Sequence, residues 1–209
     1  MYRYFIKNQL NITFNWHITI YSIIKILFIA IKIVPDQSFT AIYRELIAKL
    51  SYENLRFVEP EKLHLTLRFL GDTEEKKIPD IDRLMKKSAE ANKAFTLNIN
   101  NTGVFGSSYN PRVIWFGIDH NEYLTHLHTR IETDLTKVGF FSDRQNFVPH
   151  LTLSRVKQLK DLKLFQKIIG EFREKEIMKQ DVTEFSLIES ILMKEGPIYT
   201  TLNSYTLKQ

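Results

Sequence analysis

Apolar residues along the chain follow two patterns, and each pattern predicts a type of element. Recurrence at three- and four-residue spacing predicts four helices, and Asp36 is expected to cap the first of them. Short apolar or alternating runs bounded by proline, glycine or polar residues predict strands. The predicted helices cover residues 36–50, 78–91, 121–138 and 160–169, and the predicted strands cover residues 26–33, 55–58, 62–70, 95–99, 112–118, 147–155, 183–193 and 198–207.

These elements divide the chain into two similar halves. Each half has a strand, a helix and then a strand that carries the same tetrapeptide. Gly71 is expected to end the first of these tetrapeptide strands, and Gly103–Gly106 is interpreted as a turn. The chain lacks the glycine-rich turns of dinucleotide-binding folds and a Walker-type phosphate loop. We therefore predict an α+β, bilobal protein with two pseudo-symmetric lobes, each with a mostly antiparallel sheet and flanking helices, and with the functional cleft between them.

The repeated tetrapeptide is His-Leu-Thr-Leu, at His64–Leu67 and His150–Leu153. Side chains alternate between the two faces of a strand, so the histidine and threonine of each copy share one face. Leucines occupy the other face and require a core. The predicted polar faces contain His64 and Thr66 in the first copy and His150, Thr152 and Ser154 in the second; the predicted apolar faces contain Leu63, Leu65, Leu67 and Phe69, and Leu151 and Leu153.

The polar faces carry groups suited to acid–base chemistry on an anion. A neutral imidazole accepts a proton and an imidazolium donates one. A threonine hydroxyl donates a hydrogen bond to an anionic oxygen. Two such pairs facing each other would clamp a phosphate. The alternative is that each is only the solvated face of an amphipathic strand; the shared phase and the arginines that follow, Arg68 and Arg155, favour the clamp.

Composition narrows the functional classes. The 209 residues suit one domain or two small lobes, and the net charge of +5 suits an anionic partner such as RNA. The absence of cysteine excludes disulfides and thiolate zinc sites and fits a cytoplasmic protein. His126 and His128 lie two residues apart in a predicted helix and point in different directions, so no metal site is expected there.

The N-terminal region is apolar but does not predict a membrane span. Lys25 and Lys32 interrupt the apolar stretch at residues 18–34, and no small-residue cleavage site follows. A buried strand explains this stretch better than a bilayer crossing. Residues 1–24 precede the first strong element and are interpreted as an N-terminal extension, and residues 25–209 as a single bilobal domain.

Four segments together resemble the 2H phosphoesterase family, and specifically its branch of RNA 2′,3′-cyclic phosphodiesterases, also called 2′-5′ RNA ligases. The paired motifs, the proline before the second histidine and the PRVIW segment carry the resemblance. The segments are KILFIAIKIVP at residues 25–35, EKLHLTLRFLG at 61–71, PRVIWFG at 111–117 and FVPHLTLSR at 147–155.

The resemblance implies a metal-independent enzyme without cofactors that opens a 2′,3′-cyclic phosphate at an RNA 3′ end to leave a 2′-phosphate. It implies that His64 donates a proton and His150 accepts one. It also implies a phosphate-binding role for Thr66, Thr152, Arg155 and Arg144. Val148 stands where relatives frequently carry arginine. A monomer is expected.

Three alternatives remain open from the sequence. The enzyme could act on 2′-5′ linkages, or on small cyclic nucleotides, or the chain could bind RNA ends without catalysis. Intact histidines in both motifs argue against the last of these, because binding alone needs no acid–base pair. Arg68, Arg144 and Arg155 are expected to make the cleft basic. One ring of Trp115 and Phe116, which alternate in a strand, is expected in the core, while an aromatic at the cleft mouth would suit base stacking.

Overall fold

The computed structural model describes residues 23–141, 146–194 and 196–209 of the chain. Asp36 caps the first helix as predicted, since its Oδ1 accepts a hydrogen bond from the backbone N–H of Phe39 at 2.7 Å. The elements are β1 (Ile24–Lys32), α1 (Gln37–Lys49), β2 (Asn54–Phe57), β3 (His64–Glu74), α2 (Ile78–Ala91), β4 (Phe95–Ser107), β5 (Asn110–Ile118), α3 (Glu122–Thr136), β6 (His150–Gln158), α4 (Leu162–Glu171), β7 (Glu176–Val182), β8 (Glu184–Leu192) and β9 (Pro197–Thr206), with short 3₁₀ turns at Pro60–Lys62 and Glu75–Lys77.

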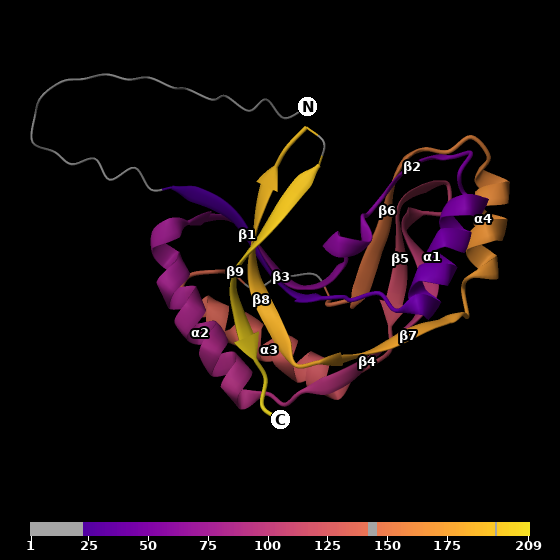
Figure 1. The fold of residues 1–209 in the computed structure, drawn as a ribbon. Helices are drawn as coiled ribbons and strands as arrows, with labels where there is room; N and C mark the ends of the chain where they lie inside the picture. Colours follow the sequence, from indigo (N-terminus) through magenta and orange to yellow (C-terminus); the bar gives the residue numbers. More distant parts are fainter. Residues whose placement is uncertain (1–22, 142–145, 195) are drawn as a thin grey trace, which may run out of the picture.

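The described strands form one curled antiparallel sheet in the order β7-β4-β5-β6-β3-β1-β8-β9, and β2 pairs with β6. The sheet has two parts that meet where β3 and β6 pair (Figure 1). Helices α2 and α3 pack together beside β3 and β9, and α1 and α4 lie beside β7 and β4 (Figure 1). The predicted α+β class with two lobes of antiparallel sheet is confirmed.

The lobes do not correspond to the two halves of the sequence. Strands β1 and β3 from the first half pair with each other, and β1 also pairs with β8 near the C-terminus. Helix α1 lies against β7, whereas α3 from the second half packs on α2. Sequence periodicity identifies which face of a helix is apolar but not which sheet will cover it. The two lobes are therefore interleaved along the chain.

Glycines end strands less often here than the sequence predicts. Strand β3 continues past Gly71 to Glu74, because Gly71, at φ +68°, follows a bulge at Leu70. Residues Gly103–Gly106 lie within β4 rather than in a turn. Gly103 lies under an aromatic ring, and a methyl group there would come within 2.1 Å of the Trp115 ring.

Strand β7, which the sequence pattern does not predict, lies at one edge of the sheet. Its side chains include charged residues at Glu176, Lys179 and Asp181, and only β4 pairs with it among the described strands. Edge strands commonly carry charges that discourage pairing with other chains. The short apolar pair Ile177 and Met178 does not produce the alternation that identifies a strand.

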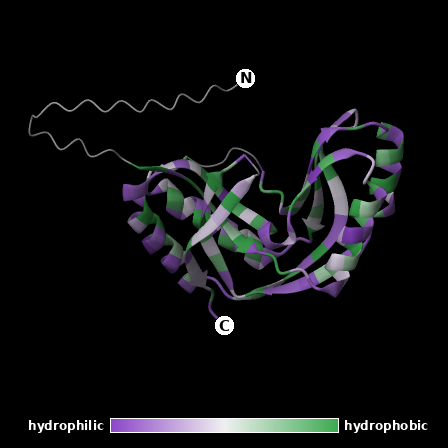
Figure 2. Cartoon of the chain, turned by 45° about the horizontal axis from the view of Figure 1, so that its top comes forward, coloured by the Kyte–Doolittle hydropathy of each residue, from purple (hydrophilic) through white to green (hydrophobic). Residues whose placement is uncertain are grey.

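One core cluster of buried apolar side chains runs through both parts of the sheet. Apolar and polar residues alternate along the strands and around the helices (Figure 2). Buried residues from both lobes, such as Leu27, Phe116, Leu151 and Phe185, belong to the same cluster. The two lobes thus share this main core. The predicted division into an extension at 1–24 and a domain at 25–209 stays a prediction, since residues 1–22 lie outside the described part.

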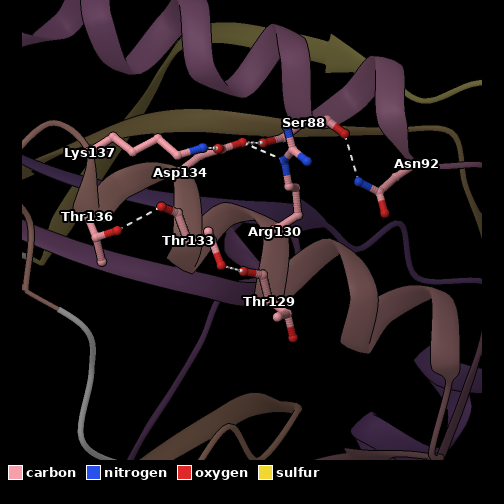
Figure 3. Close-up of polar contacts among 8 residues, drawn as sticks. All are labelled: Ser88, Asn92, Thr129, Arg130, Thr133, Asp134, Thr136 and Lys137. Carbon is pink, nitrogen blue, oxygen red and sulfur yellow. Dashed lines mark hydrogen bonds and ion pairs between the residues drawn. The ribbon is translucent and has the colours of Figure 1, made fainter.

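A buried carboxylate joins α2 to α3 (Figure 3). The side chain of Asp134 is fully buried and accepts hydrogen bonds from Ser88 at 3.0 Å and from Arg130 at 2.7 Å, and it also pairs with Lys137. Burial alone raises the pKa of Asp134, but the hydrogen bonds from Lys137, Arg130 and Ser88 outweigh burial and bring its pKa below the ordinary value. The carboxylate therefore stabilises the folded state in its charged form.

Replacing this carboxylate tests the link between the helices. We expect Asp134→Asn to lower the free energy of unfolding by about 1–2 kcal/mol near pH 7, because two cations lose their partner and both are partly exposed. Since the pKa of Asp134 is depressed on folding, this stabilisation is present above the unfolded pKa. It disappears as the pH falls through the folded pKa. Urea unfolding followed by circular dichroism measures both effects.

The matched control is Asp80→Asn, which removes an exposed carboxylate paired with Arg83 in the first turn of α2. We expect that change to stay within about 0.5 kcal/mol of wild type. Equal effects of the two substitutions would show that the buried position of Asp134 is not important.

Candidate active site

One pairing between β3 and β6 brings the two tetrapeptides together. Leu65 and Leu151 are partners in the antiparallel register. Residues on either side of this pair then lie opposite one another, so His64 faces Thr152 and Thr66 faces His150. Identical tetrapeptides paired antiparallel about their second residue have local two-fold symmetry. The two histidines lie diagonally across the strand pair, each beside the threonine of the other motif.

The leucines fix the orientation of this arrangement. Leu65 and Leu151 are buried in the core at 1% and 0% exposure. Their polar neighbours in both strands are only partly buried. The period of two in a strand therefore sends the histidines and threonines away from the core, as the sequence predicts.

Each histidine is held by a carbonyl two residues before it. Nδ1 of His64 lies 2.8 Å from the carbonyl oxygen of Lys62, and Nδ1 of His150 lies 2.7 Å from that of Val148. A carbonyl only accepts, so each Nδ1 carries the proton and donates it. In both rings Nε2 is then the nitrogen left to receive or release a proton.

A bulge after each motif changes which side chains reach the site. The β1–β3 register skips Leu67, and the β5–β6 register skips Leu153, so each bulge lies at the last leucine of a motif. A bulge inserts one residue and reverses the alternation beyond it. Ser154 is consequently buried at 0% exposure. The prediction that Ser154 shares a face with His150 and Thr152 is wrong.

The same reversal exchanges Arg68 and Phe69. Simple alternation predicts Phe69 in the core, but its side chain is 59% exposed and lines the cleft. Arg68 lies on the opposite face, where its Nε is 3.1 Å from Glu132 of α3 and its guanidinium donates to the carbonyl of Phe141. Arg68 therefore contacts α3 and Phe141; it does not line the cleft over the threonines, but it does line the smaller hollow that contains His150.

Aromatic rings surround the histidines. Phe28 of β1 and Tyr199 of β9 lie with ring centroids 5.0 and 5.3 Å from that of His64. Phe28 belongs to a small apolar cluster with Ala30 and Ile188 on the cleft side of the sheet. Phe105 of β4 meets His150 edge to face at 4.7 Å. Packing of this kind restricts the rings to few orientations.

The two histidines differ in their surroundings. Burial lowers the pKa of His64 and the nearby His150 lowers it further, while the hydrogen bond to Lys62 opposes both effects only in part. The His64 ring is thus neutral in the empty site at neutral pH. Burial also raises the pKa of the Tyr199 hydroxyl, against the influence of Arg155 and Lys62, so this group remains protonated and can donate.

A cleft of about 310 Å³ lies over the strand pair. Its lining includes His64, Thr66, Thr152, Arg155, Phe69 and Tyr199. A second hollow of about 330 Å³ shares Thr66 and Phe69 and contains His150 and Phe105. A ligand centred on the threonines therefore has space toward either histidine.

The turn between β8 and β9 closes one end of the cleft. Gly196 of this turn and Pro197, the first residue of β9, line the cleft together with Arg56 of β2. A methyl group on Gly196 would lie 2.4 Å from a terminal nitrogen of the Arg56 side chain, and Gly196 has φ +137°. The positive φ favours glycine here, whereas the end of the flexible Arg56 side chain can move aside.

The structure places the other residues singled out from the sequence in different surroundings. Arg155 reaches the cleft because of the bulge at Leu153. Arg144 lies outside the described residues. Phe116 is in the core as expected for one ring of its pair, and the partly buried Trp115 packs against Phe105. His128 stacks on Phe147 with centroids 3.9 Å apart.

Sequence reasoning missed several cleft residues, among them Phe28, Tyr199, Arg56 and Lys157. For Phe28 a signal was available, because β1 is apolar on both faces and a strand of that kind must be covered on both sides. Within the described ranges, no three His, Asp or Glu side chains lie close enough to hold a metal ion. No helix in that part of the chain is long and apolar enough to cross a membrane.

Comparison with known proteins connects this site to one family. Residues 34–191 match the family described as the 2′-5′ RNA ligase superfamily. The RNA 2′,3′-cyclic phosphodiesterase of Methanothermobacter thermautotrophicus is 35% identical over 153 residues, which cover 73% of this chain and 83% of the relative. The protein of the same name from Archaeoglobus fulgidus is 32% identical over 180 residues, which cover 86% of this chain and 98% of the relative.

Solved structures agree with the sequence match. The chain superposes on the protein TT0787 of Thermus thermophilus with a TM-score of 0.73 and 25% identity, covering 88% of this chain and 98% of that protein. It superposes on E. coli LigT in complex with 3′-AMP with a TM-score of 0.67 and 25% identity, covering 89% and 99% of the two chains.

The packing of Tyr199 on His64 predicts a measurable change in protonation. Tyr199→Ala admits water to the imidazole, so the pKa of His64 should rise toward its ordinary value of about 6.5. The chemical shift of the His64 Cε1 proton, followed by NMR against pH, measures this pKa directly. In kinetic assays the limb of the kcat/KM profile that reports the titration of His64 should move to higher pH by the same amount.

Tyr123→Ala, which removes an exposed ring from α3, is the control and should leave the titration of His64 unchanged. An unchanged or lower pKa in Tyr199→Ala would contradict the role of the aromatic packing.

Proposed function

The chain belongs to the 2′-5′ RNA ligase superfamily, and from this membership we propose that it hydrolyses RNA 2′,3′-cyclic phosphate ends to 2′-phosphates with an acid–base pair of histidines and without a metal. The names of relatives at 30–35% identity support the reaction. The two-fold arrangement of the motifs about Leu65 and Leu151 is the observation that supports the mechanism with two histidines.

That arrangement suits an in-line displacement at phosphorus. The two threonine hydroxyls lie between the histidines in the register of β3 and β6 and can donate to the non-bridging oxygens of a phosphate. A histidine then lies on each side of the phosphorus. Phosphoryl transfer requires mainly such positioning and stabilisation of charge, because little covalent chemistry is left to the protein.

The proposed step breaks one bond and forms one. His150 accepts a proton from water through Nε2 as the water oxygen attacks phosphorus. The bond between phosphorus and the ribose 3′-oxygen breaks, and His64 delivers a proton from Nε2 to that oxygen. The products are a 2′-phosphate and a free 3′-hydroxyl. After the step His150 is protonated and His64 is neutral. Both rings must exchange protons with solvent before the next turnover.

The protonation of His64 depends on the substrate in this scheme. Burial favours the neutral ring in the empty cleft. A bound cyclic phosphate carries one negative charge beside the ring, and an adjacent opposite charge favours the imidazolium. Substrate binding thus supplies the negative charge that favours the imidazolium form of His64, the form that can donate a proton. Arg155 is proposed to share the phosphate, since it lines the same cleft.

The reaction is tested with a short RNA that ends in a 2′,3′-cyclic phosphate. Incubation in excess EDTA should give complete conversion, with a 2′-phosphate identified by ³¹P NMR. Loss of activity that returns on adding zinc or manganese would contradict the metal-free proposal. A 3′-phosphate product would reverse the assignment of the leaving oxygen, and no conversion in any buffer would favour end binding without catalysis.

Separate roles for the histidines predict different responses to the leaving group. His64→Ala and His150→Ala should each slow hydrolysis of the cyclic end by about 10²–10⁴. A 4-nitrophenyl phosphodiester has a leaving group that needs no proton. On that substrate His64→Ala should lose little activity, whereas His150→Ala should remain slow.

The reverse pattern would exchange the two roles. Equal losses on both substrates would show that neither histidine serves only as the acid. Circular dichroism checks that both variants fold, as expected for side chains that face the cleft.

A further inference from the structure

The symmetry of the two motifs ends at the bulges. The residue two positions beyond the first motif is Phe69, and the equivalent residue beyond the second is Arg155. Two residues farther on, the chain carries Gly71 after the first motif and Lys157 after the second. One side of the cleft is therefore basic along β6, and the other presents an exposed ring and a glycine.

The basic side continues beyond the catalytic cleft. Arg155 and Lys157 line both the cleft and a neighbouring hollow of about 690 Å³. Arg112 of β5 lines that hollow too, and the ring of Tyr109, 86% exposed, lies at its edge. Among the described residues lining these two hollows, Glu59 is the one acid, and it pairs with Lys62 at 2.8 Å.

The aromatic ring is presented by a turn that is held in place. The backbone N–H of Asn110 donates to Ser107 Oγ at 3.0 Å, and Gln166 of α4 donates to the carbonyl of Ser108 at 2.8 Å. Tyr109 follows Ser108 in this turn between β4 and β5. An exposed ring on a turn of this kind, beside cations, is the arrangement that binds single-stranded nucleic acid by stacking and charge.

We propose that the strip formed by Arg155, Lys157, Arg112 and Tyr109 binds the single-stranded RNA upstream of the cyclic phosphate. This inference rests on the proposed function, because the reacting phosphate fixes the 3′ end at the motifs. The 5′ part of the strand then has to leave the cleft. The cations along β6 mark its path.

The spacing of the strip supports this path. Residues two apart on one face of a strand are separated by about 6.5 Å, which is similar to the distance between successive phosphates of an extended strand. Neither Arg155 nor Lys157 forms an ion pair with any residue of the described chain. Their charges are therefore available to phosphates. A base near the end of the strip can stack on Tyr109.

The proposal is tested by the length of the substrate. Wild-type kcat/KM should increase at least tenfold from a cyclic mononucleotide to an RNA of about four nucleotides and then level off, as contacts along the strip are completed. Arg112→Ala and Tyr109→Ala should each lower kcat/KM about tenfold more for the tetranucleotide than for the mononucleotide. The salt dependence of kcat/KM for the tetranucleotide should lose about 0.7 in logarithmic slope in Arg112→Ala and stay unchanged in Tyr109→Ala.

Lys87→Ala is the matched control, since it removes an exposed lysine from α2, away from both hollows. Equal kcat/KM for all lengths would overturn the strip while leaving the proposed function intact, as would equal effects of Arg112→Ala and Lys87→Ala. If no cyclic end is hydrolysed, the proposed function fails. Fluorescence anisotropy with labelled RNAs that end in a 2′-phosphate then tests the strip by the same comparison of lengths and variants.

Discussion

The pairing of Leu65 with Leu151 is the constraint on which the site depends. It is where the two parts of the sheet join, and both leucines are buried in the shared core. Because the tetrapeptides are identical and antiparallel, burying these leucines places each histidine beside the threonine of the other motif. A shift of one residue in either strand would turn the histidines toward the core and expose the leucines. Hydrophobic burial therefore sets the geometry of the polar site.

The two motifs are arranged symmetrically, but the residues around them are not. The proposed chemistry needs the symmetry to place the histidines and the asymmetry to give them different protonation states. The symmetric part places the two histidines diagonally across the strand pair, with the threonines between them. The asymmetric part gives His64 a more apolar environment, with Phe28 and Tyr199 against it. It also places in the cleft the cations that follow the second motif, Arg155 and Lys157, but not Arg68, which follows the first. Two equivalent histidines would have no reason to adopt opposite protonation states. Their different surroundings supply that reason.

The sequence predicted the motif faces and all four helices, because each depends on local periodicity. It did not predict which lobe each helix joins, since α1 and α3 lie against strands that are distant in the chain. The sequence does contain a sign of each bulge, an apolar spacing of three residues where a regular strand has two. The next packed apolar residue after Leu67 is Leu70, and the next after Leu153 is Val156. The error at Ser154, Phe69 and Arg68 came from extending the period of two across those breaks. Tyr199 had no comparable signal, because its role arises from contact with a strand more than a hundred residues earlier.

If the two histidines act together on one phosphate, their contributions to catalysis are coupled, and a double-mutant cycle measures that coupling. Groups that act in the same step are strongly non-additive, because the second substitution removes a contribution already lost with the first. We predict that His64→Ala combined with His150→Ala lowers kcat/KM on the cyclic-phosphate RNA by about the same factor as the more damaging single substitution. A loss equal to the product of the two single effects would contradict the account, since it would mean that the histidines contribute independently.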